Sequence, residues 1–362
     1  EQTLITETGE AWTPRNANNK RYGEMVTLKW GLANSDNWIS AYLMGKLNPY
    51  NLVRLIHSFG VRNKAIDPVV SLCLGPCEIS VGEMVSAYTA FANKGIRVAP
   101  LFVTRIEDSD GNVLSTFAPQ MEEVISVSSA YKMLVMLRSV INEGTGGRVR
   151  RYGITADMGG KTGTTNNETD KWFCGFTPYY TASIWLGYDD NSKVLSKSIS
   201  HTKIWQTIMS QIHEGLSTGE FTPPSGIVTA QVCSQSGKLA VAGLCDEDPR
   251  GSQVITEYFS ADNVPTEECD THVKVTICND SGDIASAGCT NTSTRVYIKK
   301  SSSGTASDEE SSYSAYDSSY AITDEKLSRL CSLHNGSNAS AVKPGSQTTE
   351  ASQAVTTPSN TA

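Results

Sequence analysis

The sequence has few histidines, no long apolar run and no excess of basic charge, and each absence excludes a class of protein. Its five histidines form no triad pattern with a serine and no Gly-x-Ser-x-Gly elbow is present, so serine–histidine hydrolysis has no support. No apolar run reaches the length of a bilayer span. The net charge of -8 argues against nucleic acid as a partner, because phosphate binding needs a concentrated basic surface.

An initial methionine and a leader of basic and then apolar residues are also missing. The chain begins at Glu1, and we therefore expect that a signal or membrane anchor has been lost upstream. The 362 residues are 39% hydrophobic and 19% charged. This composition is typical of a soluble globular protein that is long enough for more than one folded unit.

Helical and strand patterns are mixed over residues 1–222, which we interpret as one α+β domain. Ser80-Val81-Gly82-Glu83 is a capping box that opens a helix, and Gly95 stops it. The other predicted elements are a hairpin of 103–106 with 113–117, a helix over 128–143, and strands over 159–165, 172–176 and 181–188. Short connections between these strands predict an antiparallel sheet.

Six of the nine cysteines follow residue 230, where a short module occurs twice. The segment Cys233–Cys245 resembles Cys278–Cys289, and a Cys-x-x-His follows each copy, at Cys269/His272 and at Cys331/His334. A Ser-Gly turn in each copy puts two cysteines at the ends of a hairpin, where they can bridge. Because the gap before Cys-x-x-His is long and unequal, we favour disulfides or free thiols over zinc, and we expect no metal and no cofactor.

We assign these hairpin modules to 223–300, after the Pro223-Pro224 boundary, as a small β-rich unit. The remainder, 301–362, is rich in serine and threonine. It predicts a linker over 301–320 and a disordered tail over 339–362, with the second Cys-x-x-His between them. The number of cysteines indicates an oxidising compartment or a metal.

The string Gly160-Lys161-Thr162-Gly163 is the strongest chemical signal. It resembles a phosphate-binding P-loop, but Thr155 stands where that template needs a glycine, and the following pattern is strand rather than helix. As a strand, the string presents the Lys161 cation and the hydroxyls of Thr162 and Thr164, while Gly163 leaves room for a second backbone. These features suit a site for an extended peptide that ends in a carboxylate. On this motif alone, however, we favour a glycine-rich edge strand with an exposed lysine.

Ser35-Asp36-Asn37 is the second chemical motif. It lies between an apolar stretch and a helical one, so the Ser35 hydroxyl and the Asn37 amide can project into one cleft. Ser-Asp-Asn followed by Lys-Thr-Gly gives two of the three motifs of the serine penicillin-recognising enzymes. The third, Ser-x-x-Lys, begins at Ser129 and at Ser200. Both follow Ser35, whereas the nucleophile should precede it, so we interpret both as coincidences.

With further segments, the chain resembles the transpeptidase domain of a bifunctional (class A) penicillin-binding protein over roughly 10–215. The segments are Trp12–Asn16, Leu28–Asn37, Gly82–Gly95, Gly144–Gly146, Gly159–Thr165 and Trp172–Pro178. The resemblance implies a serine beta-lactamase-like fold, with an antiparallel sheet flanked by helices. It also implies truncation at the N-terminus, so that the nucleophile motif, the usual glycosyltransferase domain and the membrane anchor are absent. The cysteine segments look like C-terminal extensions of such domains.

The resemblance also implies roles for individual residues. Ser35 would shuttle a proton toward the leaving nitrogen, Asn37 would hold the lysine of the missing motif and the donor peptide, and Lys161 would keep the local field positive. The backbone N–H of Thr164 would be an oxyanion-hole donor. The catalytic residues implied are Ser35, Asn37 and Lys161, and the substrate-binding residues are Thr162, Gly163, Thr164 and Thr165.

The activity implied is D,D-transpeptidation in cell-wall synthesis. A serine acyl-enzyme forms on a peptidoglycan stem peptide that ends in D-Ala-D-Ala and passes to an amine acceptor, and beta-lactams bind as mimics of the dipeptide. The expected location is the periplasmic face of the bacterial inner membrane, with the missing anchor as the only membrane contact. Two alternatives stay open: a non-catalytic cell-wall binding module, and a D,D-carboxypeptidase or beta-lactamase that transfers the acyl group to water.

Overall fold

A computed structural model describes residues 2–17, 24–151, 153–194, 200–300 and 319–334. The chain divides into two compact units. The first contains the described residues up to 17 together with Leu28–Gly226, and the second contains 24–27 and the described residues from Ile227 onward. The predicted linker over 301–320, apart from its last two residues, and the predicted tail over 339–362 lie outside the described residues.

The helices of the first unit follow the apolar patterns of the sequence. The capping box predicted at Ser80 is confirmed: its hydroxyl accepts the Glu83 N–H at 3.2 Å, and the Glu83 carboxylate accepts the Ser80 N–H at 3.1 Å. The helices are α1 (Leu28–Asn34), α2 (Asn37–Met44), α3 (Pro49–Ser58), α4 (Val81–Ala92), α5 (Val127–Asn142) and α6 (His201–Ile212), with 3-10 turns η1 (Val70–Leu74) and η2 (Gly147–Arg151).

An antiparallel sheet of three strands lies at the centre of this unit, as predicted. Its strands are β7 (Gly159–Thr164), β8 (Lys171–Phe176) and β9 (Thr181–Leu186), in the order β7-β8-β9. Phe173 packs edge-on against Trp205 of α6 at 5.1 Å between ring centroids. Gly159 lies against Phe176 and against Leu137 of α5. Since neighbouring positions of a strand face opposite ways, α5 and α6 cover opposite faces of the sheet.

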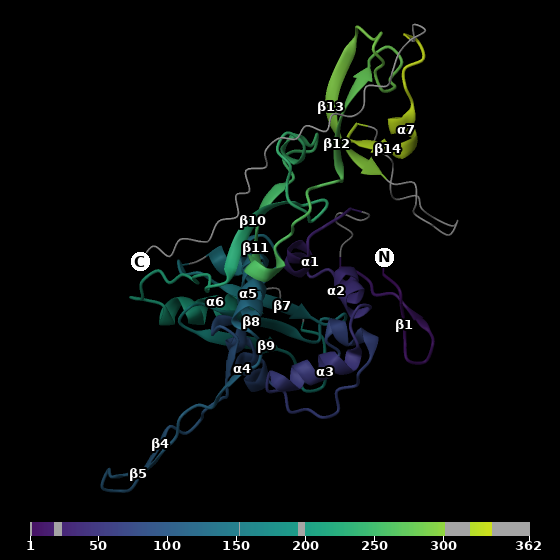
Figure 1. Cartoon of the computed structure of the whole chain (residues 1–362). Helices are drawn as coiled ribbons and strands as arrows, with labels where there is room; N and C mark the ends of the chain where they lie inside the picture. Colours follow the sequence, from purple (N-terminus) through teal and green to yellow (C-terminus); the bar gives the residue numbers. More distant parts are fainter. Residues whose placement is uncertain (1, 18–23, 152, 195–199, 301–318, 335–362) are drawn as a thin grey trace. The chain divides into compact units, whose positions relative to one another are not determined.

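The remaining strands of the first unit form three small pairs. These are β1 (Leu4–Ile5) with β2 (Ala11–Trp12), β3 (Ile96–Val98) with β6 (Met121–Glu123), and β4 (Arg105–Glu107) with β5 (Val113–Thr116). The last pair confirms the predicted hairpin. Figure 1 shows it projecting away from the helices of its unit, and its strand residues are almost all exposed.

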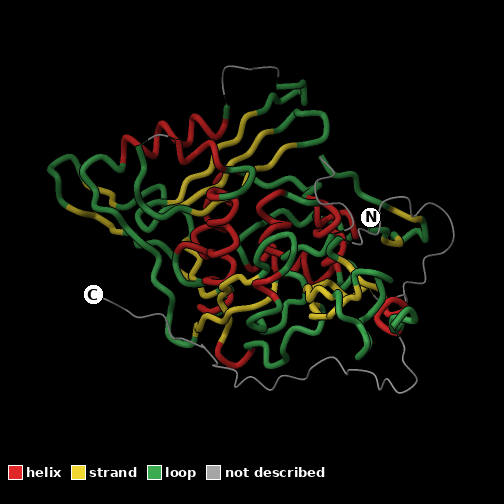
Figure 2. The backbone as a smooth tube through the Cα atoms, turned by 90° about the horizontal axis from the view of Figure 1, so that it is seen from above, coloured by secondary structure: helices red, strands yellow, loops and turns green. Residues whose placement is uncertain are grey.

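The second unit contains the two copies of the module, each built on an antiparallel pair. The strands are β10 (Ile227–Cys233) with β11 (Val254–Ser260), β12 (His272–Cys278) with β13 (Thr292–Lys300), and β14 (Ala321–Thr323), which pairs in parallel with β13. Turns η3 (Cys245–Glu247) and η4 (Ala261–Asn263) and the helix α7 (Asp324–Ser328) complete it. Figure 2 draws the described helices in red, the strands in yellow and the loops that join them in green.

The cysteines of this unit are arranged differently from the hairpin bridges considered in the sequence analysis. All nine cysteines of the chain are free thiols. Cys233, Cys245 and Cys269 form one buried cluster, and Cys278 and Cys331 form another with Cys289 against it. Each copy therefore brings its distant Cys-x-x-His back to the first two cysteines. Residues 319–334, within the stretch assigned to linker and tail, complete the second copy through β14.

Candidate active site

The Ser-Asp-Asn motif begins at a strained turn. Helix α1 ends in a Schellman arrangement, in which the Ser35 N–H donates to Leu32 O at 3.2 Å and the Asp36 N–H donates to Gly31 O at 2.9 Å. Ser35 has a φ of 55°, in the left-handed region that favours glycine. A non-glycine residue held in this conformation indicates a local constraint, and such constraints cluster at functional sites.

The segment before residue 17 fixes the rest of this motif. Asp36 caps α2 by accepting the Ile39 N–H at 3.0 Å. Asn16 bonds twice, accepting the Asn37 N–H at 2.6 Å and donating to the Asp36 carboxylate at 2.9 Å. The Asn37 side-chain amide donates to Arg15 O at 2.6 Å. These bonds orient the Asn37 side chain and hold the start of α2 against residues 15–16.

Lys161, on strand β7 of the sheet, contacts the side chain of Ser35. Its Nζ donates to the Ser35 hydroxyl at 2.9 Å and to Thr162 O at 2.9 Å. Burial lowers the pKa of Lys161 to about 8. An amine with a pKa near neutrality beside a hydroxyl can both carry a positive charge and exchange a proton with it. The structure thus brings two of the three predicted catalytic residues into contact.

Gly144 and Thr145 are two further residues of the site, beyond those predicted to act in it. A Cβ on Gly144 would lie 2.1 Å from Ala33 O, so only glycine lets these backbones approach. The Thr145 N–H donates to the same Ala33 oxygen at 3.0 Å, and its hydroxyl bonds that of Thr162 at 2.8 Å. Thr145 thus ties the end of α1 to β7. The two glycines flanking it in the sequence were the available signal.

The predicted substrate-binding residues lie on β7, an edge strand of its sheet, and in the turn that follows. Gly163 sits close to its cross-strand partner, since an added Cβ would lie 3.2 Å from Trp172 Cβ. Thr164 is exposed. The Thr165 hydroxyl accepts the N–H groups of Thr169 and Asp170 at 3.1 and 3.0 Å, which stabilises the turn into β8. Substrate binding by these residues stays a prediction.

The serines of the two later Ser-x-x-Lys strings lie at helix starts. Ser129 is in the first turn of α5, where its N–H and hydroxyl both bond the Ser126 hydroxyl. Ser200 is the N-cap of α6, and its hydroxyl bonds that of Thr202 at 2.7 Å. Both hydroxyls thus bond to a neighbouring hydroxyl at a helix start, although Ser126 rather than Ser129 caps α5 and the Ser200 side chain makes no capping bond.

An edge strand with a lysine, two threonines and a neighbouring serine can bind an extended peptide. The exposed strand edge offers main-chain hydrogen bonds, and the cation and hydroxyls offer partners for a carboxylate. Within the described residues, the two groups of side chains close enough to hold a metal ion both lie in the second unit. The Lys161 amine and the Ser35 hydroxyl offer acid–base and hydrogen-bond chemistry.

Known families match both parts of the chain. The family model described as penicillin binding protein transpeptidase domain matches residues 2–210, and that described as penicillin-binding protein 1A, C-terminal domain, matches residues 223–274. Penicillin-binding protein 1A of Clostridium novyi is 31% identical over 338 residues, which covers 91% of this chain and 38% of that protein. Its counterpart in Clostridium botulinum is 32% identical over 284 residues, or 77% of this chain and 34% of that protein.

A solved structure shares the fold. Penicillin-binding protein 1A from Haemophilus influenzae aligns with a TM-score of 0.64 at 23% identity, over 74% of this chain and 44% of that one. By sequence, the chain spans about 38% of the length of the Clostridium novyi relative. The expected fold, with an antiparallel sheet flanked by helices, is confirmed by this match. Because the transpeptidase model covers more than half of its residues, the chain belongs to the penicillin-binding protein transpeptidase family.

Proposed function

We propose that the first unit is the larger part of a peptidoglycan D,D-transpeptidase site, which binds the donor stem peptide and moves protons during acyl transfer. The observation that carries this proposal is the 2.9 Å hydrogen bond from Lys161 to Ser35, because it unites the two motifs at one point. Family membership supports the same chemistry.

The donor peptide lies along β7 in this proposal. Its backbone pairs with the exposed strand edge, and its terminal carboxylate lies near Lys161 and the Thr162 and Thr164 hydroxyls. The Thr164 N–H faces the carbonyl oxygen that becomes negative when the nucleophile attacks. A beta-lactam carries a carboxylate and a reactive amide in the same relation, and so it occupies the same site.

Ser35 and Lys161 act on the leaving group. When the D-Ala-D-Ala amide bond breaks, the departing nitrogen needs a proton, and the Ser35 hydroxyl supplies one while Lys161 restores it. Asn37 supports the lysine of the nucleophile motif and the donor peptide. Its side-chain amide is already oriented by the bond to Arg15 O.

The nucleophile of the proposed reaction is the serine of a Ser-x-x-Lys motif other than those at Ser129 and Ser200. Two observations support this. Ser129 and Ser200 bond to helix-start hydroxyls rather than to the Lys161 pair, and the related proteins are much longer than this chain. The acyl group then passes from that serine to an amine acceptor on a second stem peptide.

The enzyme acts outside the cytoplasm, at the outer face of the bacterial inner membrane, because its substrate is the cell wall. None of the helices in the described residues combines the length and the apolar character that crossing a membrane requires.

Labelling with a fluorescent penicillin tests the proposal. The chain as given should stay unlabelled, whereas the protein extended by the sequence that its gene encodes upstream should form a covalent adduct. Peptide mapping should find the adduct on a serine of an upstream Ser-x-x-Lys. An adduct on Ser129 or Ser200, or no adduct on the extended protein, contradicts the proposal. Release of D-Ala with and without an added amine then distinguishes transpeptidation from hydrolysis.

A further inference from the structure

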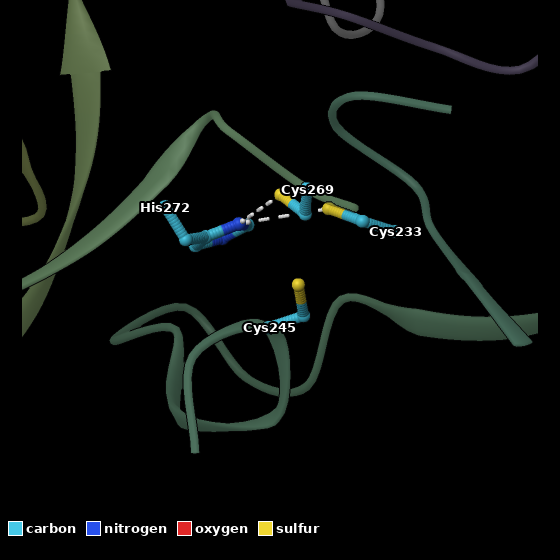
Figure 3. Close-up of side chains that lie close together, drawn as sticks. All are labelled: Cys233, Cys245, Cys269 and His272. Carbon is cyan, nitrogen blue, oxygen red and sulfur yellow. Dashed lines mark hydrogen bonds between the residues drawn. The ribbon is translucent and has the colours of Figure 1, made fainter. Parts of the chain in front are cut away.

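The second unit holds two groups of side chains with the same composition and arrangement. One consists of Cys233, Cys245, Cys269 and His272, and the other of Cys278, Cys289, Cys331 and His334. In each group the three sulfurs and one imidazole nitrogen all lie within 4.8 Å of one another. Figure 3 shows the first group, whose four side chains point into one space, with Cys269 and His272 coming from the same Cys-x-x-His segment.

The distances within each group match a tetrahedral metal. In the second group the Nδ1 of His334 lies 3.4, 3.5 and 3.4 Å from the sulfurs of Cys278, Cys289 and Cys331. Zinc with sulfur at about 2.3 Å and nitrogen at about 2.0 Å sets ligand sulfur and nitrogen about 3.5 Å apart. In the first group His272 Nδ1 lies 3.5 and 3.4 Å from the sulfurs of Cys233 and Cys269.

A carboxylate orients each histidine for metal binding. His272 Nε2 lies 2.9 Å from Asp248 Oδ2, and both side chains are fully buried. Asp248 is fixed in turn by Arg250, whose Nη2 lies 3.0 Å from it. In the second copy, His334 Nε2 lies 3.4 Å from Asp280. A proton on Nε2 that faces the carboxylate leaves the Nδ1 lone pair directed at the sulfurs, as in carboxylate–histidine–zinc sites.

Backbone donors support one sulfur in each copy. The Val241 N–H lies 3.3 Å from Cys245 Sγ, and the Ser286 N–H lies 3.3 Å from Cys289 Sγ. An N–H donor stabilises the negative charge of a thiolate, which is the form that binds metal. This contact occurs at equivalent points of the two copies.

The number and place of the cysteines favour metal over disulfides. Three cysteines per copy leave one thiol over after any disulfide, whereas a Cys3His set uses all four side chains. The cysteines also make up most of two buried clusters, with Cys233, Cys245 and Cys269 in one and only Ala285 beside Cys278 and Cys331 in the other. A structural metal held at such a cluster stabilises the fold around it.

We propose that each copy of the module binds one structural Zn²⁺ through three thiolates and one imidazole. Each thiol releases its proton on binding, so the chain takes up two Zn²⁺ and loses six protons. Soft sulfur ligands with one nitrogen in a closed tetrahedron select zinc over magnesium or calcium. In the sequence, the many residues between the second cysteine of each copy and its Cys-x-x-His argued against zinc. In the structure, an antiparallel pair of strands in each copy brings these distant residues together.

Metal analysis of the purified chain tests this inference. We expect two zinc ions per chain by elemental analysis and, after denaturation with a chelator, nine reactive thiols. Cobalt substituted for zinc should give intense tetrahedral and thiolate-to-metal absorption bands. Zinc near zero together with disulfides in the intact mass would overturn the inference, and so would cobalt bands typical of octahedral coordination.

Variants assign the sites separately. Cys269→Ser and Cys331→Ser should each reduce the zinc content from two ions to one, whereas Cys73→Ser, a free thiol of the first unit, should keep both. Because a serine variant can unfold its module, His334→Cys serves as a second probe: it should retain two zinc ions and shift the cobalt bands toward a four-thiolate spectrum. Two zinc ions retained in Cys331→Ser, or one lost in Cys73→Ser, would contradict the assignment.

Discussion

The Lys161 amine donates a 2.9 Å hydrogen bond to the Ser35 hydroxyl, and this bond joins two motifs that lie 126 residues apart. Neither side chain reaches the other by local structure. The end of α1 is held against β7 through Ala33, Gly144 and Thr145, and this contact sets the distance between the two motifs. The predictions for the catalytic site follow from this relationship.

The rate of acylation should depend on the charge of Lys161. Burial lowers its pKa to about 8, so the amine is charged below that pH and neutral above it. In the upstream-extended protein, the second-order rate constant for acylation by penicillin should fall as pH rises above about 8, by up to about tenfold per pH unit. Stopped-flow or quenched-gel assays measure it.

The control variants for this pH profile are Lys132→Ala and Lys203→Ala, which remove the lysines of the two later Ser-x-x-Lys strings. Both should keep the falling limb near pH 8. If the fall in the acylation rate constant moves to another pH in either control, Lys161 does not set the pH dependence of acylation. A rate constant that is unchanged between pH 7 and pH 9 would show the same.

Lys161 should also destabilise the folded chain at neutral pH. Its folded pKa of about 8 is below the value of about 10.4 in an unfolded chain, so the unfolded state binds more protons between these values. Stability from this group therefore rises as pH increases from about 8 to about 10.4. Lys161→Met should raise the thermal midpoint at pH 7, and this gain should shrink across that window. If Lys161→Met raises the thermal midpoint by the same amount at every pH, the lowered pKa of Lys161 is not the cause of the destabilisation.

The variant Ser35→Gly distinguishes the role of the Ser35 hydroxyl in acylation from the effect of its backbone conformation on stability. Glycine adopts the left-handed conformation that Ser35 holds at a φ of 55°, which relieves roughly 1 kcal/mol of strain. The free energy of unfolding should be unchanged or raised, while acylation of the extended protein should fall by about 10²- to 10⁴-fold. Urea unfolding and penicillin labelling measure the two effects.

Ser40→Gly is the matched control, because Ser40 lies inside α2. It should lower the free energy of unfolding by roughly 1 kcal/mol and leave acylation nearly unchanged. If Ser35→Gly instead unfolds the chain, or retains full acylation, the roles assigned to the turn and to the hydroxyl are wrong.

Local signals in the sequence predicted local structure well. The capping box at Ser80 fixes the start of α4 through bonds within four residues, and turn residues between apolar runs fix β7 to β9. The site itself depends on tertiary contacts. That Lys161 contacts Ser35 was implied by family resemblance and not by any periodicity, and the backbone approach at Gly144 has no local cause, so Thr145 received no role.

Gly144→Ala tests the backbone contact that aligns the site. The added methyl group would lie 2.1 Å from Ala33 O, so the backbone must shift and the Thr145 bond to the same oxygen weakens. The thermal midpoint should drop. Gly82→Ala is the control, since Gly82 lies in the first turn of α4 with no atom within 4 Å of an added Cβ, and its midpoint should stay or rise. Equal midpoints in the two variants would contradict the account.

The cysteine clusters show where sequence reasoning reached its limit. The ligands of one copy are spread from Cys233 to His272, and those of the other from Cys278 to His334, so spacing gave no compact finger. Pairing of β12 with β13 and of β13 with β14 closes the second gap. If six thiols bind metal, the number of cysteines is no longer evidence for an oxidising compartment.

A double-mutant cycle on Ser35 and Lys161 tests the central claim most directly. The second-order rate constant for acylation by a labelled penicillin is measured in the upstream-extended protein, in Ser35→Ala, in Lys161→Ala and in the double variant. Residues that act as a unit lose function non-additively. We predict that each single variant acylates about 10²-fold or more slowly, and that the double variant is little slower than either. Unchanged acylation in Lys161→Ala, or losses that simply multiply, would contradict the claim.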